Sequence, residues 1–153
     1  MPAGALHGEK YEERDDPRGA VWYSERGRRR IRGVQDLRLE RLDHIVLSVR
    51  DVDATCTFYQ RVLGMETETF GRGRRALRFG RQKINVENTG RPTPGSGHLC
   101  FISSAPLADW LEHLKASGVS VLEGPVKRSG AEGPIDSIYL RDPDGNSIEI
   151  STY

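Results

Sequence analysis

An internal repeat in the residues from Leu42 onward constrains the fold more than any other feature of this sequence. Two apolar runs, LDHIVLSV and SGHLCFIS, each carry a histidine near their start, and these residues, His44 and His98, are 54 positions apart. A glycine follows each histidine after 20 positions, as Gly64 and Gly118. Self-similarity of this kind indicates that one structural unit occurs twice. We therefore expect two copies of one module.

Each repeat continues from its apolar run into a segment with helical periodicity. In DVDATCTFYQRVLG, Ala54, Phe58 and Val62 recur at helical spacing, and Asp51 or Asp53 is suited to cap the amino terminus. The closing glycine of each segment is suited to a left-handed carboxy-terminal cap. In APLADWLEHLKASG the apolar residues follow the i, i+3, i+4, i+7 pattern of a helix, and they are Leu107, Trp110, Leu111 and Leu114.

Short runs with strand character follow each predicted helix. They are METETFG, RRALRFG and QKINVEN in the first repeat, and VSVLEGP, IDSIYLRD and NSIEIST in the second. The Pro- and Gly-rich segment Thr89–Gly97 is typical of a linker between them. The sequence thus predicts an α+β fold in which two βαβββ modules, residues 42–88 and 97–152, make up one domain over residues 41–153.

Strand parity assigns several polar side chains to one face of each sheet. In the first strand Ile45, Leu47 and Val49 are expected to pack under the helix, which leaves His44 on the opposite face. We expect Cys100 to be a small buried filler, although its parity also allows it to line a cavity. The same alternation along the other strands places five further side chains on the faces away from the helices, namely Asn85, Glu87, His98, Cys100 and Glu149.

The first 41 residues differ in composition from the rest of the chain. They hold ten Lys and Arg and eight Asp and Glu, with the densest basic cluster in RGRRRIR at Arg26–Arg32. A segment this polar buries too little apolar surface to offset the entropy that it loses on ordering. We therefore expect residues 1–40 to be a disordered extension, with most of 1–38 unstructured. The acidic run EKYEERDD argues against a mitochondrial presequence. A basic patch for nuclear import or nucleic acid stays an alternative.

Bulk composition excludes several classes of protein. The net charge of +1 gives no electrostatic footprint for nucleic acid or an acidic membrane. There is no apolar run of membrane-spanning length and no secretory signal near Met1. The two cysteines, Cys56 and Cys100, have no CxxC spacing and are expected to be reduced and buried, with a single disulfide as the alternative. We expect a cytoplasmic protein.

Four blocks of the chain resemble the vicinal oxygen chelate superfamily, which includes glyoxalase I, extradiol dioxygenases and fosfomycin-resistance proteins. They are RLDHIVLSV, FYQRVLGME, EGPVKRSGAEGPIDSIY and RDPDGNSIE, and they are most similar to the group of glyoxalase domain-containing protein 5 and its small bacterial relatives. The resemblance covers about residues 42–153. It implies a cupped mixed sheet around one divalent metal ion, with ligands from the first and last strands of each module.

The resemblance carries the ligand positions onto His44, His98 and Glu149. The fourth position is open, because the acid of glyoxalase I aligns with Asn85 while Glu87 lies two residues further on the same face. Imidazole and carboxylate ligands suit Fe(II), Mn, Ni or Zn. The resemblance also implies that Glu149 or Glu87 acts as the catalytic base and that a homodimer forms. The site then lies within one chain or between two.

Other candidate residues have simpler explanations. We expect His113 to be a hydrogen-bonded polar residue of its helix, and Phe58, Tyr59 and Trp110 to belong to the core. The segment Gly124–Asp136 is expected to be a mobile edge whose Lys127 and Arg128 meet an anionic substrate, or else a plain strand connection.

Three functions compete at this stage. The first is a metalloenzyme of lyase, isomerase or dioxygenase type that acts on a small oxygenated molecule. The second is a metal-free module that binds or sequesters a small molecule. The third assigns the function to the basic extension, as an adaptor for an anionic partner. Fold alone cannot choose between them.

Overall fold

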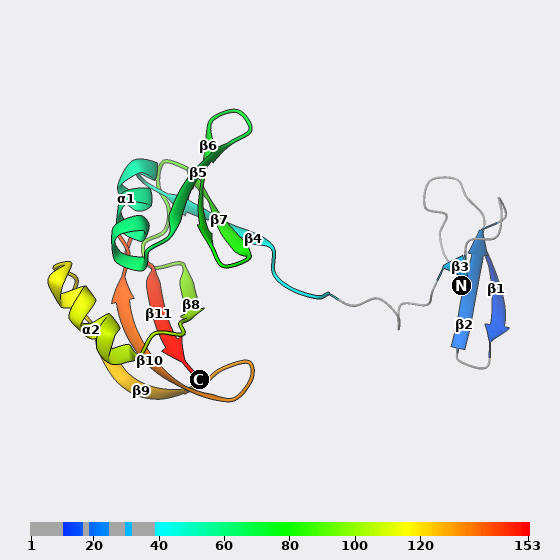
Figure 1. Ribbon diagram of the computed structural model, residues 1–153. Coiled ribbons are helices and arrows are strands. Elements are labelled where there is room, and N and C mark those ends of the chain that lie inside the picture. The colour runs from blue at the N-terminus through cyan, green and yellow to red at the C-terminus, as the bar shows by residue number, and fades with distance from the viewer. Residues whose placement is uncertain (1–10, 17–18, 25–29, 32–38) are drawn as a thin grey trace. The chain divides into compact units, whose positions relative to one another are not determined.

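The computed structural model describes residues 11–16, 19–24, 30–31 and 39–153, and the chain divides into two units, 1–41 and 42–153. In the first unit, strands β1 (Tyr11–Asp16), β2 (Gly19–Ser24) and β3 (Arg30–Ile31) form a sheet in the order β1-β2-β3 (Figure 1). The rest of residues 1–38, including most of the RGRRRIR cluster, lies outside the described residues. Disorder over most of this range stays a prediction.

The second unit begins with a module that has the predicted order of elements. Its last strand runs parallel to its first strand, and the other neighbours in the sheet are antiparallel, in the order β4-β7-β6-β5. The elements are β4 (His44–Val49), α1 (Val52–Leu63), β5 (Glu66–Phe70), β6 (Arg74–Phe79) and β7 (Gln82–Asn88).

The second module repeats this topology and confirms the predicted α+β fold. Its sheet has the order β8-β11-β10-β9, again with a parallel pair formed by the first and last strands. Residues 89–97 between the modules contain neither helix nor strand, as predicted for the linker. The elements are β8 (His98–Ile102), α2 (Leu107–Ala116), β9 (Glu123–Ser129), β10 (Pro134–Arg141) and β11 (Ser147–Thr152).

The helix ends follow the residues expected to cap them, with one exception. Asp51 caps α1 because its side chain accepts a hydrogen bond from the Ala54 amide at 2.9 Å. Gly64 ends that helix with φ of 67°, and Gly118 follows α2 with φ of 68°. Helix α2 begins after Pro106 without a side-chain cap.

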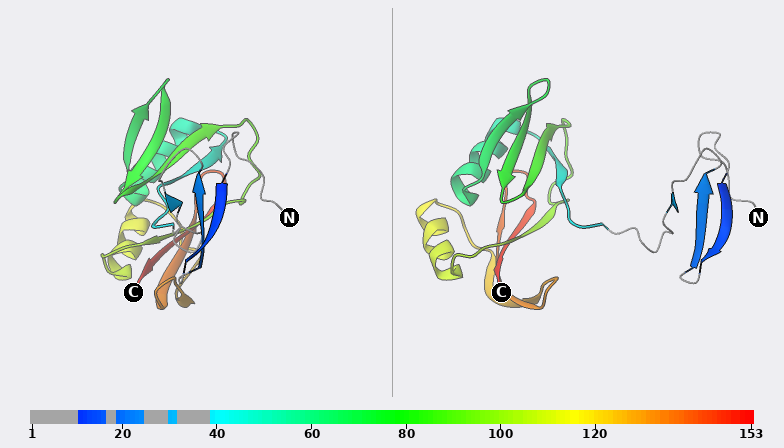
Figure 2. Two further views of the ribbon diagram at one scale, coloured as in Figure 1. Left: turned by 90° about the vertical axis from the view of Figure 1, so that its right-hand side faces the viewer. Right: turned by 45° about the vertical axis from the view of Figure 1, so that its right-hand side comes forward.

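The two modules share one hydrophobic core. Helices α1 and α2 lie on the same flank of the unit, one beside each sheet, as the views in Figures 1 and 2 agree. Across the modules, Phe79 and Phe101 meet edge to face with ring centroids 5.2 Å apart. The fully buried centre of the core comes from both modules and includes Val49, Tyr59, Val62, Leu77, Leu114, Ile138, Leu140 and Ile148. The opposite face of each sheet, which we call its open face, is free of helices.

The DPDGN turn between β10 and β11 ties the modules together. Asp142 is buried and accepts a hydrogen bond from the Tyr59 hydroxyl of α1 at 3.1 Å. Asp144 accepts one from the Arg50 amide at 3.1 Å, and Asn146 accepts one from the Gly97 amide at 2.8 Å. Buried carboxylates need hydrogen-bond partners, and here distant segments supply them. The motif therefore joins these segments through hydrogen bonds.

The structure corrects the prediction for the segment before β10. Strand β9 begins at Glu123, four residues after the start of the predicted strand, and most of the predicted mobile edge, Gly124–Asp136, lies in the β9–β10 hairpin. The hairpin turn is closed by a hydrogen bond from the Gly130 amide to the Gly133 carbonyl at 2.7 Å. Backbone pairing with β10 thus overrides the high glycine content of the segment.

Candidate metal centre

Glu149 lies on the open face of the second sheet and is almost completely buried. Its strand, β11, is flanked by β8 and β10, and the residue is only 7% exposed. Carboxylate atom Oε1 accepts a hydrogen bond from Ser137 Oγ at 2.6 Å and another from Ser151 Oγ at 3.3 Å. Atom Oε2 lies 3.1 Å from Nε2 of His98. The two carboxylate oxygens therefore have different surroundings.

These contacts keep Glu149 ionised. Burial by itself raises the pKa of the carboxyl group, but hydrogen bonds from Ser137, Tyr139 and His98 together outweigh burial, and the net pKa lies below its usual value. A buried carboxylate that stays charged at neutral pH is suited to bind a cation.

His98 and Glu149 fit half of a metal site. The imidazole is 59% exposed, and its ring meets Tyr139 edge to face with centroids 6.0 Å apart. Neighbouring ligand atoms around a metal bound at about 2.1 Å lie about 3 Å apart, which matches the separation of His98 Nε2 and Glu149 Oε2. Metal binding at such a pair displaces the proton that the two atoms share.

His44 lies on the open face of the first sheet, as parity predicted. Its Nδ1 is 2.9 Å from Oδ1 of Asp43, and its side chain is 47% exposed. A carboxylate on one ring nitrogen orients the imidazole and leaves the other nitrogen as the ligand atom. Asp43 was not among the residues predicted from the sequence, although its position beside His44 was the available signal.

The two candidates for the fourth ligand differ in their surroundings. Glu87 is exposed near the end of β7, whereas Asn85 is only 7% exposed. The Asn85 Oδ1 atom is buried and has no hydrogen-bond partner among the described residues. Such an orphaned oxygen is uncommon and fits a position that awaits a ligand or a partner surface.

The predicted ligands fall into two groups, one on each sheet, which we call the candidate half-sites. Within the described part of the chain, no group of three His, Cys, Asp or Glu side chains could hold one metal ion. The structure brings His98 and Glu149 together on the second sheet, while His44, Asn85 and Glu87 lie on the first. A pocket of about 360 Å³ is nevertheless lined by both histidines and by Cys100.

The cysteines are free thiols with different exposure. Cys56 is buried, as predicted. Cys100 is exposed, so the expectation of a buried filler is wrong for this residue. Its Sγ lies 3.5 Å from Ser151 Oγ.

The basic residues of the β9–β10 hairpin are already engaged. Lys127 binds Asp136 at 2.7 Å. Arg128 binds Glu123 at 2.6 Å, and its Nε donates a hydrogen bond to Tyr139 Oη at 3.1 Å. Tyr139 in turn shares a hydrogen bond with Glu149, so Arg128 is linked to the half-site through Tyr139.

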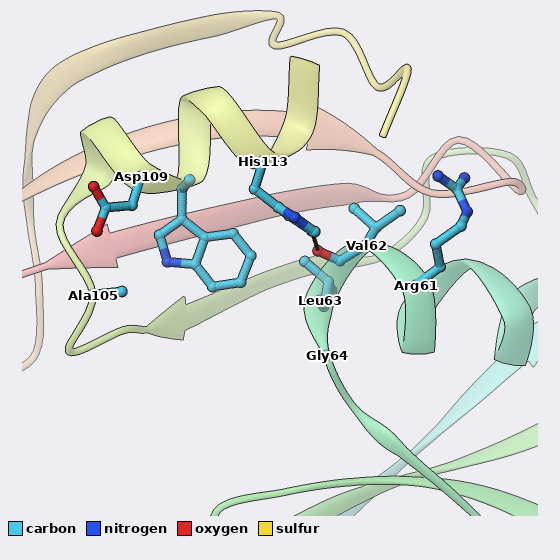
Figure 3. A pocket seen from close by; sticks show the side chains of 8 residues that line it. Arg61, Val62, Leu63, Gly64, Ala105, Asp109 and His113 are labelled. Carbon is cyan, nitrogen blue, oxygen red and sulfur yellow. Dashed lines mark hydrogen bonds between the residues drawn. The ribbon is translucent and has the colours of Figure 1, made fainter. Parts of the chain in front are cut away.

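A second pocket, of about 290 Å³, lies between the end of α1 and helix α2 (Figure 3). His113 lines it, and the ring nitrogen Nε2 of His113 lies 3.0 Å from the Val62 carbonyl oxygen. This contact confirms the structural role predicted for His113. Tyr59 belongs to the core as predicted, whereas Trp110 is partly buried and lines this pocket.

Comparison with known proteins identifies the family. The Glyoxalase/Bleomycin resistance protein/Dioxygenase superfamily matches residues 41–150 of the chain. The chain belongs to this superfamily. Among its curated members, the virulence protein STM3117 of Salmonella typhimurium is 50% identical over 123 residues, which are 75% of this chain and 85% of that protein.

Two further members of the glyoxalase superfamily extend the comparison. The glyoxalase domain-containing protein RDO1 of Mycosarcoma maydis is 50% identical over 127 residues, covering 78% of this chain and 72% of that protein. The metallothiol transferase FosB of Bacillus licheniformis is 31% identical over 125 residues, covering 72% and 74%. Among solved structures, the integron cassette protein VCH_CASS1 of V. cholerae has a TM-score of 0.73 and 49% identity, covering 76% of this chain and 98% of that one.

Proposed function

We propose that this protein is a small divalent-metal enzyme of lyase, isomerase or dioxygenase type that binds a small substrate through neighbouring oxygen atoms. The observation that carries the proposal is the pair formed by His98 and Glu149, with ligand atoms 3.1 Å apart on an open sheet face. Burying an ionised carboxylate costs free energy. Hydrogen bonds from Ser137 and Ser151 to Oε1 offset this cost and keep the carboxylate ionised, so that it is available to bind a cation beside His98.

Two relatives support a metal. One is FosB, whose name, metallothiol transferase, refers to a metal. The other shares only the fold, at 23% identity and a TM-score of 0.58, and is FosX of Listeria monocytogenes in complex with Mn(II) and a dihydroxypropylphosphonic acid. When bound, such a metal supplies Lewis acidity that stabilises negative charge on substrate oxygens.

We infer that the complete site forms between two chains of a homodimer. One chain would supply His44, oriented by Asp43, together with Glu87 or Asn85 as the fourth donor. The other would supply His98 and Glu149. The support is the separation of these groups on two sheets, each with an open face that a second copy could cover.

Three further proposals follow from the sequence. We place residues 1–40 as an extension separate from the catalytic domain, and we place the protein nearest to the group of glyoxalase domain-containing protein 5. We also propose a cytoplasmic location. No helix among the described residues is both long and apolar enough to cross a membrane.

Metal content tests the central proposal. Tag-free protein would be loaded with Fe(II), Mn, Ni or Zn, desalted and analysed by mass spectrometry, beside the variants His98→Ala and Glu149→Gln. We expect about one equivalent per chain in the native protein and at least a tenfold loss of affinity in both variants. Glu112→Gln on the exposed side of α2 is the matched control and should retain the metal. If native protein binds none of the four metals, the proposed metal-dependent enzyme function is refuted.

The alternative is a metal-free module that binds a small molecule. The pocket of about 360 Å³ favours it, because this volume suits a small ligand without any metal. The same loading experiment separates the two functions, since the binding module predicts no stoichiometric metal in any variant.

A further inference from the structure

Ser137 makes the shortest hydrogen bond to the candidate ligand Glu149. It lies on β10 and is fully buried, and its Oγ donates to Glu149 Oε1 at 2.6 Å. Ser151 adds a second hydroxyl, 2.8 Å from Ser137 Oγ and 3.3 Å from the same carboxylate oxygen. Hydrogen bonds to an ionised acceptor are short and strong, and this one has the length of a charge-assisted bond.

The contacts are divided unequally between the two carboxylate oxygens. Both serine hydroxyls approach Oε1, Ser137 from β10 and Ser151 from β11, whereas His98 approaches Oε2 from the edge strand β8. Rotation of the carboxylate away from this arrangement would remove the charged acceptor of the Ser137 hydroxyl and leave it the neutral Ser151 hydroxyl, 2.8 Å away, which is a weaker acceptor. The geometry therefore holds the carboxylate in one orientation.

We propose that Ser137 is a positioning residue that holds Glu149 through Oε1, so that Oε2 would be the atom left to hold a metal ion and Glu149 would serve as a ligand rather than as a base. Proton transfer then falls to a less constrained group, for which the exposed Glu87 is the candidate. This inference rests on the proposed metal site. It gives Glu149 and Glu87 different roles, whereas the sequence left either of them as the catalytic base.

The first test measures Mn(II) affinity of the full chain by electron paramagnetic resonance of the free ion. We expect Ser137→Ala to weaken binding by about ten- to a hundredfold, as is usual for the loss of a group that orients a ligand. Ser137→Thr keeps the hydroxyl and should restore most of the affinity. Ser147→Ala, on the same strand as Glu149, is the matched control and should stay within about twofold of native.

A second measurement avoids substitution at a buried position. Infrared difference spectra of the native protein with and without Mn(II) report whether the Glu149 carboxylate binds through one oxygen or two, with Glu149→Gln to assign the band. We expect the splitting of a one-oxygen ligand. Two-oxygen binding, or unchanged Mn(II) affinity in folded Ser137→Ala, would overturn the role of Ser137 while leaving the metal site intact. Failure of native protein to bind any of Mn(II), Fe(II), Ni or Zn would instead overturn the proposed function and this role with it.

Discussion

At the scale of single residues, the last strand explains why a carboxylate lies between two isoleucines. Ile148 and Ile150 point into the shared core, and Glu149 points to the open face. Ser137 and Tyr139 on β10 then supply the hydrogen bonds that keep its charge. A solvent-facing glutamate would need none of these partners. The polar neighbours are therefore better evidence for a site than the carboxylate itself.

The charge of Glu149 predicts how stability depends on pH. Because folding lowers the pKa of this group, its ionised form stabilises the native state above the unfolded pKa near 4.5, and this contribution is lost as the pH falls through the lower folded pKa. Between about pH 6 and about pH 3, metal-free native protein should lose more free energy of unfolding than Glu149→Gln. Urea titrations at both pH values measure the difference. Equal losses in the two proteins would contradict the assigned ionisation.

At the scale of elements, the β9–β10 hairpin determines where Ser137 lies. Gly124 has φ of 114°, and a Cβ at this position would come within 2.8 Å of the Ile138 Cα and even closer to the Ser137 carbonyl oxygen. Only glycine allows the two strands to approach so closely here. The close approach sets the backbone position from which Ser137 reaches Glu149.

Gly124→Ala should therefore disturb both stability and the half-site. The control is Gly133→Ala, because that residue also has a positive φ, 145°, but a Cβ there meets nothing within 4 Å. We expect Gly124→Ala to cost about 1–3 kcal/mol more in unfolding free energy than the control, since overpacking adds to backbone strain. It should also weaken Mn(II) binding, and the control should not. Urea denaturation and metal titration check the two effects. Similar costs for both variants would argue against the close approach.

At the scale of the whole molecule, the two modules turn their helices toward one core and leave both sheet faces open. The half-site of the first module contains His44, and that of the second contains His98 and Glu149. Among the described residues, no three of these donors converge on one point. Neither half-site is therefore complete within one chain. In the proposed homodimer, a second copy would provide the missing donors by symmetry.

Subunit mixing tests this arrangement directly. If each site takes His44 from one chain and His98 from the other, His44→Ala and His98→Ala homodimers should both lack metal. Mixing them with subunit exchange creates dimers with one intact site, so we expect recovery of about one quarter of the native metal content. Exchange followed by mass spectrometry measures this fraction. No recovery after confirmed exchange would indicate that each site belongs to a single chain.

The sequence alone determined the modules and the faces of their strands. The paired histidines, the helix periodicity that ends at Gly64, and the alternation around Glu149 are local features, and each is set by the geometry of one helix or strand. The sequence left Asp51 and Asp53 as alternatives for the amino-terminal cap, and the structure shows that Asp51 is the cap. The linker at 89–97 was recognisable for the same reason, since its composition excludes regular structure.

Only the tertiary structure decided what surrounds those side chains. The hydroxyl of Ser137 and the phenol of Tyr139 reach Glu149 through the register of β10 against β11, which the pattern within a single strand does not specify. Pairing with β10 also placed residues 124–129 in strand β9, where the sequence left open a mobile edge or a plain strand connection. Cys100 proved exposed because β8 is an edge strand. Local patterns set which face a residue takes, whereas its neighbours on that face follow from how strands are ordered and aligned.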